Sequence, residues 1–166
     1  MNHGDKLLKK VISGGQTGVD QAALRAAADH GLETGGWCPP GCRSEDGPIP
    51  AIFGLCETPQ EVSPGAERIP RSQRTLWNVR DSDATLVFNP EELNDKGTMA
   101  TLKFARELDK AVYIIGRTGE EDAVDCAKWI RKVKAEVLNV AGPSESTCPG
   151  IGRRAGIFMS ILFENL

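Results

Sequence analysis

The chain has 166 residues, of which 40% are hydrophobic, 26% charged and 5% aromatic. These values predict a single domain over residues 1–166 and exclude disordered, fibrous and membrane-spanning classes of protein. The net charge of -3 and the pI near 5.5 provide no attraction for nucleic acid, so neither nucleic acid nor a membrane is expected as a partner. The cysteine count is odd, at five, and the first ten residues lack the apolar run of a signal peptide. We therefore expect a cytoplasmic protein with reduced thiols.

The segment from Val11 to Arg25, VISGGQTGVDQAALR, has the pattern of a strand, a tight turn and a helix. Glycines let the backbone of such a turn approach a ligand, and the first amide groups of a helix favour an anion. The pattern predicts a phosphate-binding loop. Its candidate ligand-binding residues are Gly14, Gly15, Gln16, Thr17, Gly18 and Asp20.

Two known phosphate-binding motifs are incomplete in this loop. The dinucleotide pattern G-x-G-x-x-G has Ser13 where its first glycine belongs, and Glu33 lies at the start of a strand instead of the end. No lysine followed by serine or threonine comes after the glycines, so a P-loop for Mg-ATP is not predicted. A turn that only joins a strand to a helix is the alternative.

The next segment has little regular pattern. Residues 32–37 are typical of a short strand that Gly35 and Gly36 interrupt, and residues 39–70 are rich in proline and glycine without sustained periodicity. Loops of such length usually serve a function. We expect this insertion, at about 37–70, to fold over the ligand and bring Arg43, Glu45 and Asp46 to its rim. A solvated charged turn and a contact with a second subunit are the alternatives.

The second half of the chain alternates helices and strands. A helix is expected from Ser72 to Asp81, with Ser72 as its cap and with Arg74 and Asn78 on one face, Arg71 lying at the edge of that face. The further elements are a strand at 84–88, a helix at 98–109, a strand at 111–115, a helix at 122–134, a strand at 137–140 and a helix at 150–163.

This alternation predicts an α/β fold: a doubly wound, mainly parallel Rossmann-like sheet with helices on both faces. If strand 84–88 neighbours the first strand, their carboxyl ends form the ligand crevice. The loop at Gly14 and the loop at Gly97 would then flank it. In addition to Arg74 and Asn78, the candidate ligand-binding residues from this half are Asn89, Gly97, Thr98, Thr101, Ser144 and Ser146.

No protein-ligated metal site is predicted. Cys38 and Cys42 are four residues apart, but a zinc site would need a second ligand pair, and the histidines are His3 and His30. Cys126 in a predicted helix is expected to be a small core residue, and Trp129 is expected to pack rather than to act.

Five blocks of sequence resemble the putative molybdenum carrier family: SGGQTGVDQAAL, GGWCPPGCRSEDGPIP, RTLWNVRDSDATLVF, GTMAT and AGPSESTCPGI. That family is similar in fold to the lysine-decarboxylase-like, or Lonely Guy, proteins and to the molybdenum cofactor carrier of algae. The resemblance implies a Rossmann-like fold, a homo-oligomer (dimer or tetramer) and a small phosphate-bearing ligand. That ligand would be the molybdenum cofactor, a pterin, or a nucleotide.

Three positions depart from these relatives. Lys96 precedes Gly97 where a second glycine is expected, and no arginine lies near Ser144. Thr101 stands where Lonely Guy hydrolases have a catalytic acid, and a threonine cannot act as that carboxylate. The first hypothesis is therefore a carrier or binding protein for the molybdenum cofactor. A nucleotide-processing enzyme that uses Glu45 or Asp46, or a sensor of a nucleotide derivative, is the alternative.

Overall fold

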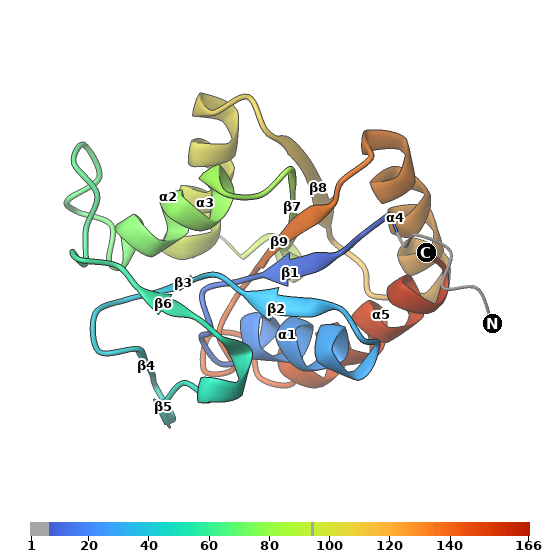
Figure 1. Ribbon diagram of the computed structural model, residues 1–166, viewed down its shortest axis with the longest axis horizontal. Helices are drawn as coiled ribbons and strands as arrows, with labels where there is room; N and C mark the ends of the chain where they lie inside the picture. The colour runs from blue at the N-terminus through green and yellow to red at the C-terminus, as the bar shows by residue number, and fades with distance from the viewer. Residues whose placement is uncertain (1–6, 94) are drawn as a thin grey trace.

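A five-stranded parallel sheet forms the centre of the computed structural model, which describes residues 7–93 and 95–166. In spatial order the strands are β2 (Glu33–Gly35), β1 (Lys10–Ile12), β9 (Val137–Ala141), β7 (Ala84–Phe88) and β8 (Ala111–Ile115). Helices α1 (Val19–Asp29), α4 (Glu120–Val133) and α5 (Ile151–Glu164) lie on one face, and α2 (Ser72–Arg80) and α3 (Lys96–Glu107) lie on the other (Figure 1). The predicted doubly wound α/β fold is confirmed.

The last strand of the chain occupies the middle of the sheet. In the register, Val11 of β1 pairs with Leu138 of β9, and Asn139 of β9 pairs with Thr85 of β7. The expectation that strand 84–88 neighbours the first strand is therefore wrong, because β9 lies between them. If the strands are numbered from β9, their order is 3-2-1-4-5, which is that of a Rossmann sheet.

The core lies between the sheet and α1, α4 and α5. Every residue of β7 is buried because helices cover both faces of the sheet there, which explains its unbroken apolar sequence. Phe88 of β7 meets Phe158 of α5 edge-on, with ring centroids 5.3 Å apart. Cys126 is fully buried in α4, and Trp129 packs against Tyr113, as the sequence predicted. A smaller core under α2 and α3 includes Val79 and Phe104.

The long segment, residues 37–70, contains more structure than its sequence predicts. Strands β3 (Trp37–Cys38) and β6 (Cys56–Glu57) pair with each other, β4 (Arg43–Ser44) and β5 (Gly47–Pro48) form a hairpin, and η1 (Ala51–Phe53) is a 3₁₀ turn. Ile49 and Phe53 pack with Leu24 of α1, which holds the segment against the domain. The continuous strand expected over 32–37 is divided at Gly36, whose φ of 120° only glycine adopts readily.

The prediction of reduced thiols is wrong for one pair of cysteines. Cys38 and Cys42 form a disulfide with Cα atoms 5.2 Å apart, whereas Cys56, Cys126 and Cys148 are free. The amide of Cys42 donates to the carbonyl of Pro39 at 2.9 Å, and Gly41 has a φ of 86°. This reversal of the chain at Pro40 and Gly41, typical of a type II turn, brings the two sulfurs together.

The cap of α2 and the start of α3 also differ from the predictions. Arg71, and not Ser72, is the residue that precedes α2, and it has a left-handed φ of 59°. The Ser72 hydroxyl instead donates to the carbonyl of Ala66 and accepts from the amide of Ser63. Helix α3 begins at Lys96 because Asp95 caps it, and the 3₁₀ turn η2 (Pro90–Glu92) follows β7.

No helix in residues 7–93 and 95–166 combines the length and the apolarity needed to cross a membrane. His3, considered above as a metal ligand, lies outside the described residues.

The aromatic contact between β7 and α5 allows a test of the core. We expect Phe158→Ala to lower the free energy of unfolding by about 3–5 kcal/mol, because it leaves a cavity against Phe88. The adjacent Ile157→Ala is the control, since Ile157 is 50% exposed and its loss should cost about 0.5 kcal/mol or less. Urea denaturation of both variants measures the difference. Equal losses would contradict the assignment of Phe158 to the core.

Candidate functional site

A cavity of about 350 Å³ lies beyond the carboxyl end of β9, between the start of α1 and the starts of α2 and α3. The loops at Gly14 and Gly97 both supply residues to it, as predicted, although their strands are not neighbours in the sheet. It is lined by Gln16, Asp20, Glu45, Pro70, Arg71, Arg74, Thr75, Asp95, Lys96, Gly97, Thr101, Ala141, Gly142, Ser144, Ser146 and Thr147.

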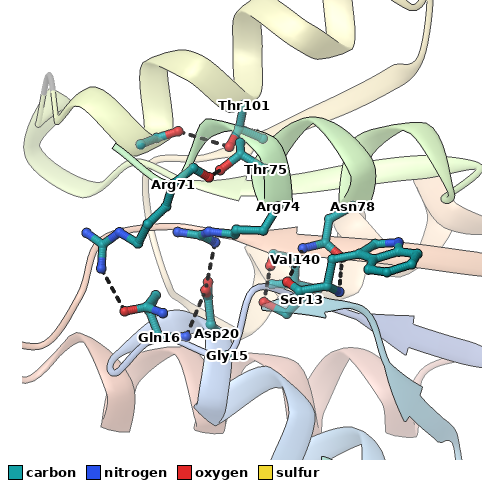
Figure 2. Close-up of polar contacts among 12 residues, drawn as sticks. Ser13, Gly15, Gln16, Asp20, Arg71, Arg74, Thr75, Asn78, Thr101 and Val140 are labelled. Carbon is teal, nitrogen blue, oxygen red and sulfur yellow. Dashed lines mark hydrogen bonds and ion pairs between the residues drawn. The ribbon is translucent and has the colours of Figure 1, made fainter. Parts of the chain in front are cut away.

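A buried ion pair forms the floor of this cavity. Nη1 of Arg74 lies 3.4 Å from Oδ2 of Asp20, and the two side chains are 14% and 3% exposed (Figure 2). Gly14 makes this contact possible, because a Cβ atom there would lie 1.8 Å from that guanidinium nitrogen. The same carboxylate accepts a hydrogen bond from the amide of Gln16 at 3.2 Å. The pair thus connects α2 to the start of α1.

Burial determines the electrostatics of this pair. Removal from water raises the pKa of Asp20, and the Arg74 charge opposes that rise. Burial likewise lowers the pKa of Arg74. The negative charge of Asp20 opposes this lowering, whereas the positive charge of Arg71 lowers the pKa further. Arg74 remains charged, since a guanidinium does not lose its proton in proteins. Its Nε is buried without a hydrogen-bond partner among the described residues.

Arg71 extends from the residue before α2 toward the same cavity. Its Nη1 donates to Oε1 of Gln16 at 2.8 Å (Figure 2). Nε2 of Gln16 in turn donates to the carbonyl of Arg43 at 3.2 Å. Lys96 is an exposed side chain in the cavity wall at the start of α3. Three cationic groups, Arg71, Arg74 and Lys96, therefore line one cavity.

Glu45 links the long segment to two loops of the site. Its carboxylate accepts hydrogen bonds from the hydroxyls of Thr17 and Ser146, and from the amide of Ser146 at 3.1 Å. The hydroxyl of Thr17 in turn accepts from the amide of Glu145 at 3.1 Å. The hydroxyl of Ser146, followed by that of Thr17, makes the largest contribution to holding the pKa of Glu45 below its ordinary value.

The starts of α3 and α5 are already paired with acidic side chains of the chain itself. Asp95 accepts from the amide of Thr98 at 3.0 Å and from its hydroxyl, and Glu145 accepts from the amides of Gly150 and Gly152 at the start of α5. In α1, Asp20 lies in the first turn. Asp95 and Glu145 thus occupy the positions at which α3 and α5 would attract a ligand anion, whereas no side chain among the described residues caps α1 or α2.

Part of the predicted set of residues lies in the cavity wall. These residues are Gln16, Asp20, Glu45, Arg74, Gly97, Thr101, Ser144 and Ser146. The hydroxyl of Thr101 donates to the carbonyl of Gly97 at 3.0 Å, so Thr101 brings no charge to the cavity wall.

The other predicted residues lie outside this wall. Thr17, Gly18 and Asp46 line a separate, more open depression of about 540 Å³ between α1 and α5. A Cβ atom at Gly15 would meet the side chains of Leu55 and Ile49, so this glycine serves packing against the long segment. A branched residue at Gly15 would therefore collide with Leu55 and Ile49 of the long segment.

Four more of the predicted residues have contacts elsewhere in the structure. Asn78 exchanges hydrogen bonds with the backbone of Trp37, at 2.9 and 3.0 Å. Arg43 contributes its carbonyl to the Gln16 contact, and Thr98 is held by Asp95. Asn89 follows β7, and its buried Oδ1 has no partner among the described residues.

The sequence did not identify several residues of the cavity. Lys96 is interpreted there only as the replacement of a glycine, Asp95 is not among the predicted residues, and Arg71 is placed at the edge of the helix face. Asp95 was recognisable, since an aspartate three residues before Thr98 is a common helix cap. The structure groups no three His, Cys, Asp or Glu side chains of its described residues in a way that could hold a metal ion.

The buried pair can be tested by removing one partner and then both. We expect Arg74→Met to lower the free energy of unfolding by about 3–5 kcal/mol, because it leaves Asp20 buried without its counter-charge. Adding Asp20→Asn should recover most of this loss. Arg80→Met, at the exposed end of the same helix, is the control and should cost about 0–1 kcal/mol. If the double variant is no more stable than Arg74→Met, the two charges are not coupled.

The Glu45 contacts predict a pH dependence. Because the pKa of Glu45 is lowered in the folded chain, its contribution to stability is present above its ordinary pKa of 4.5 and is lost as the pH falls through the folded value. An NMR titration of the carboxyl carbon should give a pKa below 4.5. Ser146→Ala should move this pKa upward, whereas Ser44→Ala, in the neighbouring turn, should not. A Glu45 pKa that is unaffected by Ser146→Ala would contradict the assigned contacts.

Comparisons with known proteins identify the family and support the fold. Residues 11–163 match the model of the circularly permutated YpsA SLOG family, and the central position of β9 fits such a permutation. The chain is also similar to a crystal structure from Syntrophus aciditrophicus SB described as a putative molybdenum carrier protein. The identity is 34% and the TM-score is 0.83, over 94% of this chain and 95% of that one. None of the curated proteins matches. The chain belongs to the circularly permutated YpsA SLOG family.

Proposed function

We propose that this protein binds and carries a small phosphate-bearing molecule in the cavity between α1, α2 and α3, and that the molecule is the molybdenum cofactor or a related pterin or nucleotide. The observation that supports this most directly is the convergence of Arg71, Arg74 and Lys96 on one cavity. Arginine and lysine are the side chains that bind phosphate most strongly.

The balance of hydrogen bonds supports an anionic ligand. The acidic side chains of the cavity wall are already engaged: Asp20 by Arg74, Asp95 by Thr98 and Glu45 by hydroxyl groups. Arg71 has five N–H groups, and the structure shows one side-chain hydrogen bond for it, to Gln16, among the described residues. The cations therefore retain donors for a ligand.

The donor set suits the phosphate end of a pterin cofactor. Arg71, Arg74 and Lys96 would hold the phosphate, and the unpartnered Nε of Arg74 is a buried donor in the same guanidinium. A molybdenum ion on such a cofactor would be bound by the cofactor's own sulfurs, so the protein need supply no metal ligands. The name of the Syntrophus aciditrophicus protein supports a molybdenum carrier at the level of the family. Assembly as a homo-oligomer and a cytoplasmic location stay predictions.

A nucleotide-processing enzyme is the second candidate, because Glu45 places a carboxylate in the cavity wall. Its lowered pKa keeps Glu45 ionised at neutral pH, so it could stabilise positive charge on a sugar but would be a poor proton donor. Thr101 offers no carboxylate. The binding hypothesis therefore accounts for more of the wall than the enzyme hypothesis.

Calorimetric titration with AMP, GMP and inorganic phosphate tests the proposal. Arg71→Ala and Lys96→Ala should each weaken binding roughly tenfold to a hundredfold, because each removes a charged hydrogen-bond donor. Arg80→Ala is the matched control, since Arg80 lies on α2 but stacks on Trp77 away from the cavity. Unchanged affinity in both variants would overturn the assignment of the cavity. Release of free base from AMP or GMP would favour the enzyme, and mass spectrometry of any co-purified molecule would identify the ligand.

A further inference from the structure

The Cys38–Cys42 disulfide lies directly before the part of the long segment that reaches the cavity. Cys38 is fully buried, whereas Cys42 is only partly buried. An attacking thiolate would therefore reach the sulfur of Cys42, and Cys38 would be the leaving group. The bond is placed so that thiol–disulfide exchange can take place from one side.

The residues after Cys42 connect this bond to the ligand-binding loops. The carbonyl of Cys42 accepts from the amide of Ile49 at 2.9 Å, which closes the base of the β4–β5 hairpin. Within that hairpin, the carbonyl of Arg43 binds Gln16, and Glu45 binds Thr17 and Ser146. The disulfide ties one end of this hairpin to β3.

The structure also accommodates the reduced form of the pair. Sγ of Cys38 lies 3.5 Å from the carbonyl oxygen of Cys56. A thiol at Cys38 could donate a hydrogen bond to that oxygen, whereas a disulfide sulfur has no hydrogen to donate. The turn over residues 39–42 has its own backbone hydrogen bond and a glycine at the left-handed position. The turn can therefore form without the disulfide. The S–S bond can then open while the segment stays folded, and only the covalent link between β3 and the hairpin is lost.

We propose that Cys38–Cys42 is a thiol-exchange site, whose reduction loosens the Glu45 contacts and opens the cavity. A dithiol reductant supplies the electrons. Its thiolate attacks Sγ of Cys42, the S–S bond breaks, and the electron pair goes to Sγ of Cys38, which takes up a proton. The second thiol of the reductant then displaces Cys42 as a thiol, and the reductant leaves as a disulfide. The protein gains two protons and two electrons, and the reductant loses them.

The first experiment counts the thiols. Alkylation in denaturant should modify three cysteines of the oxidised protein, Cys56, Cys126 and Cys148, and all five after treatment with dithiothreitol. Alkylation of all five without reductant would overturn the proposal, because no disulfide would then be present to exchange.

The second experiment follows amide exchange by NMR, without any ligand, in the oxidised and the reduced full chain. The amide of Ser146 donates to Glu45, so its exchange should accelerate on the order of tenfold on reduction, whereas core amides such as that of Val87 should not change. Equal rates for Ser146 in the two states would overturn the proposal. This readout is independent of the proposed ligand, so a failure of nucleotide binding would not affect it.

Three variants separate the disulfide from other thiol effects. Cys42→Ser should show the fast exchange with or without dithiothreitol. Cys56→Ser, the matched control, should respond like the unmodified chain, because Cys56 is free and exposed. Glu45→Ala should show fast exchange in both states. A response to dithiothreitol that persists in Cys42→Ser, or that disappears in Cys56→Ser, would contradict the assigned pair.

Discussion

The contact between Arg74 and Asp20 is the constraint on which the site depends. Two charges removed from water are tolerated only as partners, so α2 must be held at a fixed distance from the start of α1. The contact requires a residue without a side chain at Gly14, since any Cβ atom would collide with the guanidinium. The first glycine of the loop thus makes room for an arginine rather than for a ligand. Arg71, three residues before Arg74, is carried to the cavity by the same helix.

The acidic residues at the starts of α3 and α5 and the cations of the cavity wall together set the charge that a ligand would meet. Asp95 and Glu145 neutralise the partial positive charges at the starts of α3 and α5, which removes the usual source of phosphate affinity in a Rossmann-like fold. The remaining attraction comes from Arg71 and Arg74 at the start of α2 and from Lys96 at the start of α3. Glu45 meanwhile connects the long segment to the loop after β9, so the same segment both contributes to the cavity wall and carries the disulfide.

The strand order explains why segments distant in sequence meet here. The carboxyl ends of parallel strands lie at one edge of the sheet, and the permutation places the last strand, β9, between β1 and β7. The loop at residues 142–147 therefore lies beside the loop at residues 13–18, at the position that the first loop of an unpermuted Rossmann sheet would occupy. A chain whose central strand is the last of its strands can form the same crevice, because only adjacency in the sheet matters.

The sequence by itself determined the class of fold and the main helices and strands outside residues 37–70. The apolar run from Ala84 to Phe88 and the helical spacing of later residues are local patterns, and they predicted the alternating α/β architecture and much of the cavity wall, including Arg74, Gly97 and Ser146. Only the tertiary structure decided the position of β9, the pairing of Cys38 with Cys42, the packing role of Gly15, and the places of Arg71 and Lys96 in the wall. The periodicity of a segment indicates which face of a helix or strand is buried. Contacts between residues distant in sequence depend on which buried faces pack together, and no local pattern specifies that arrangement.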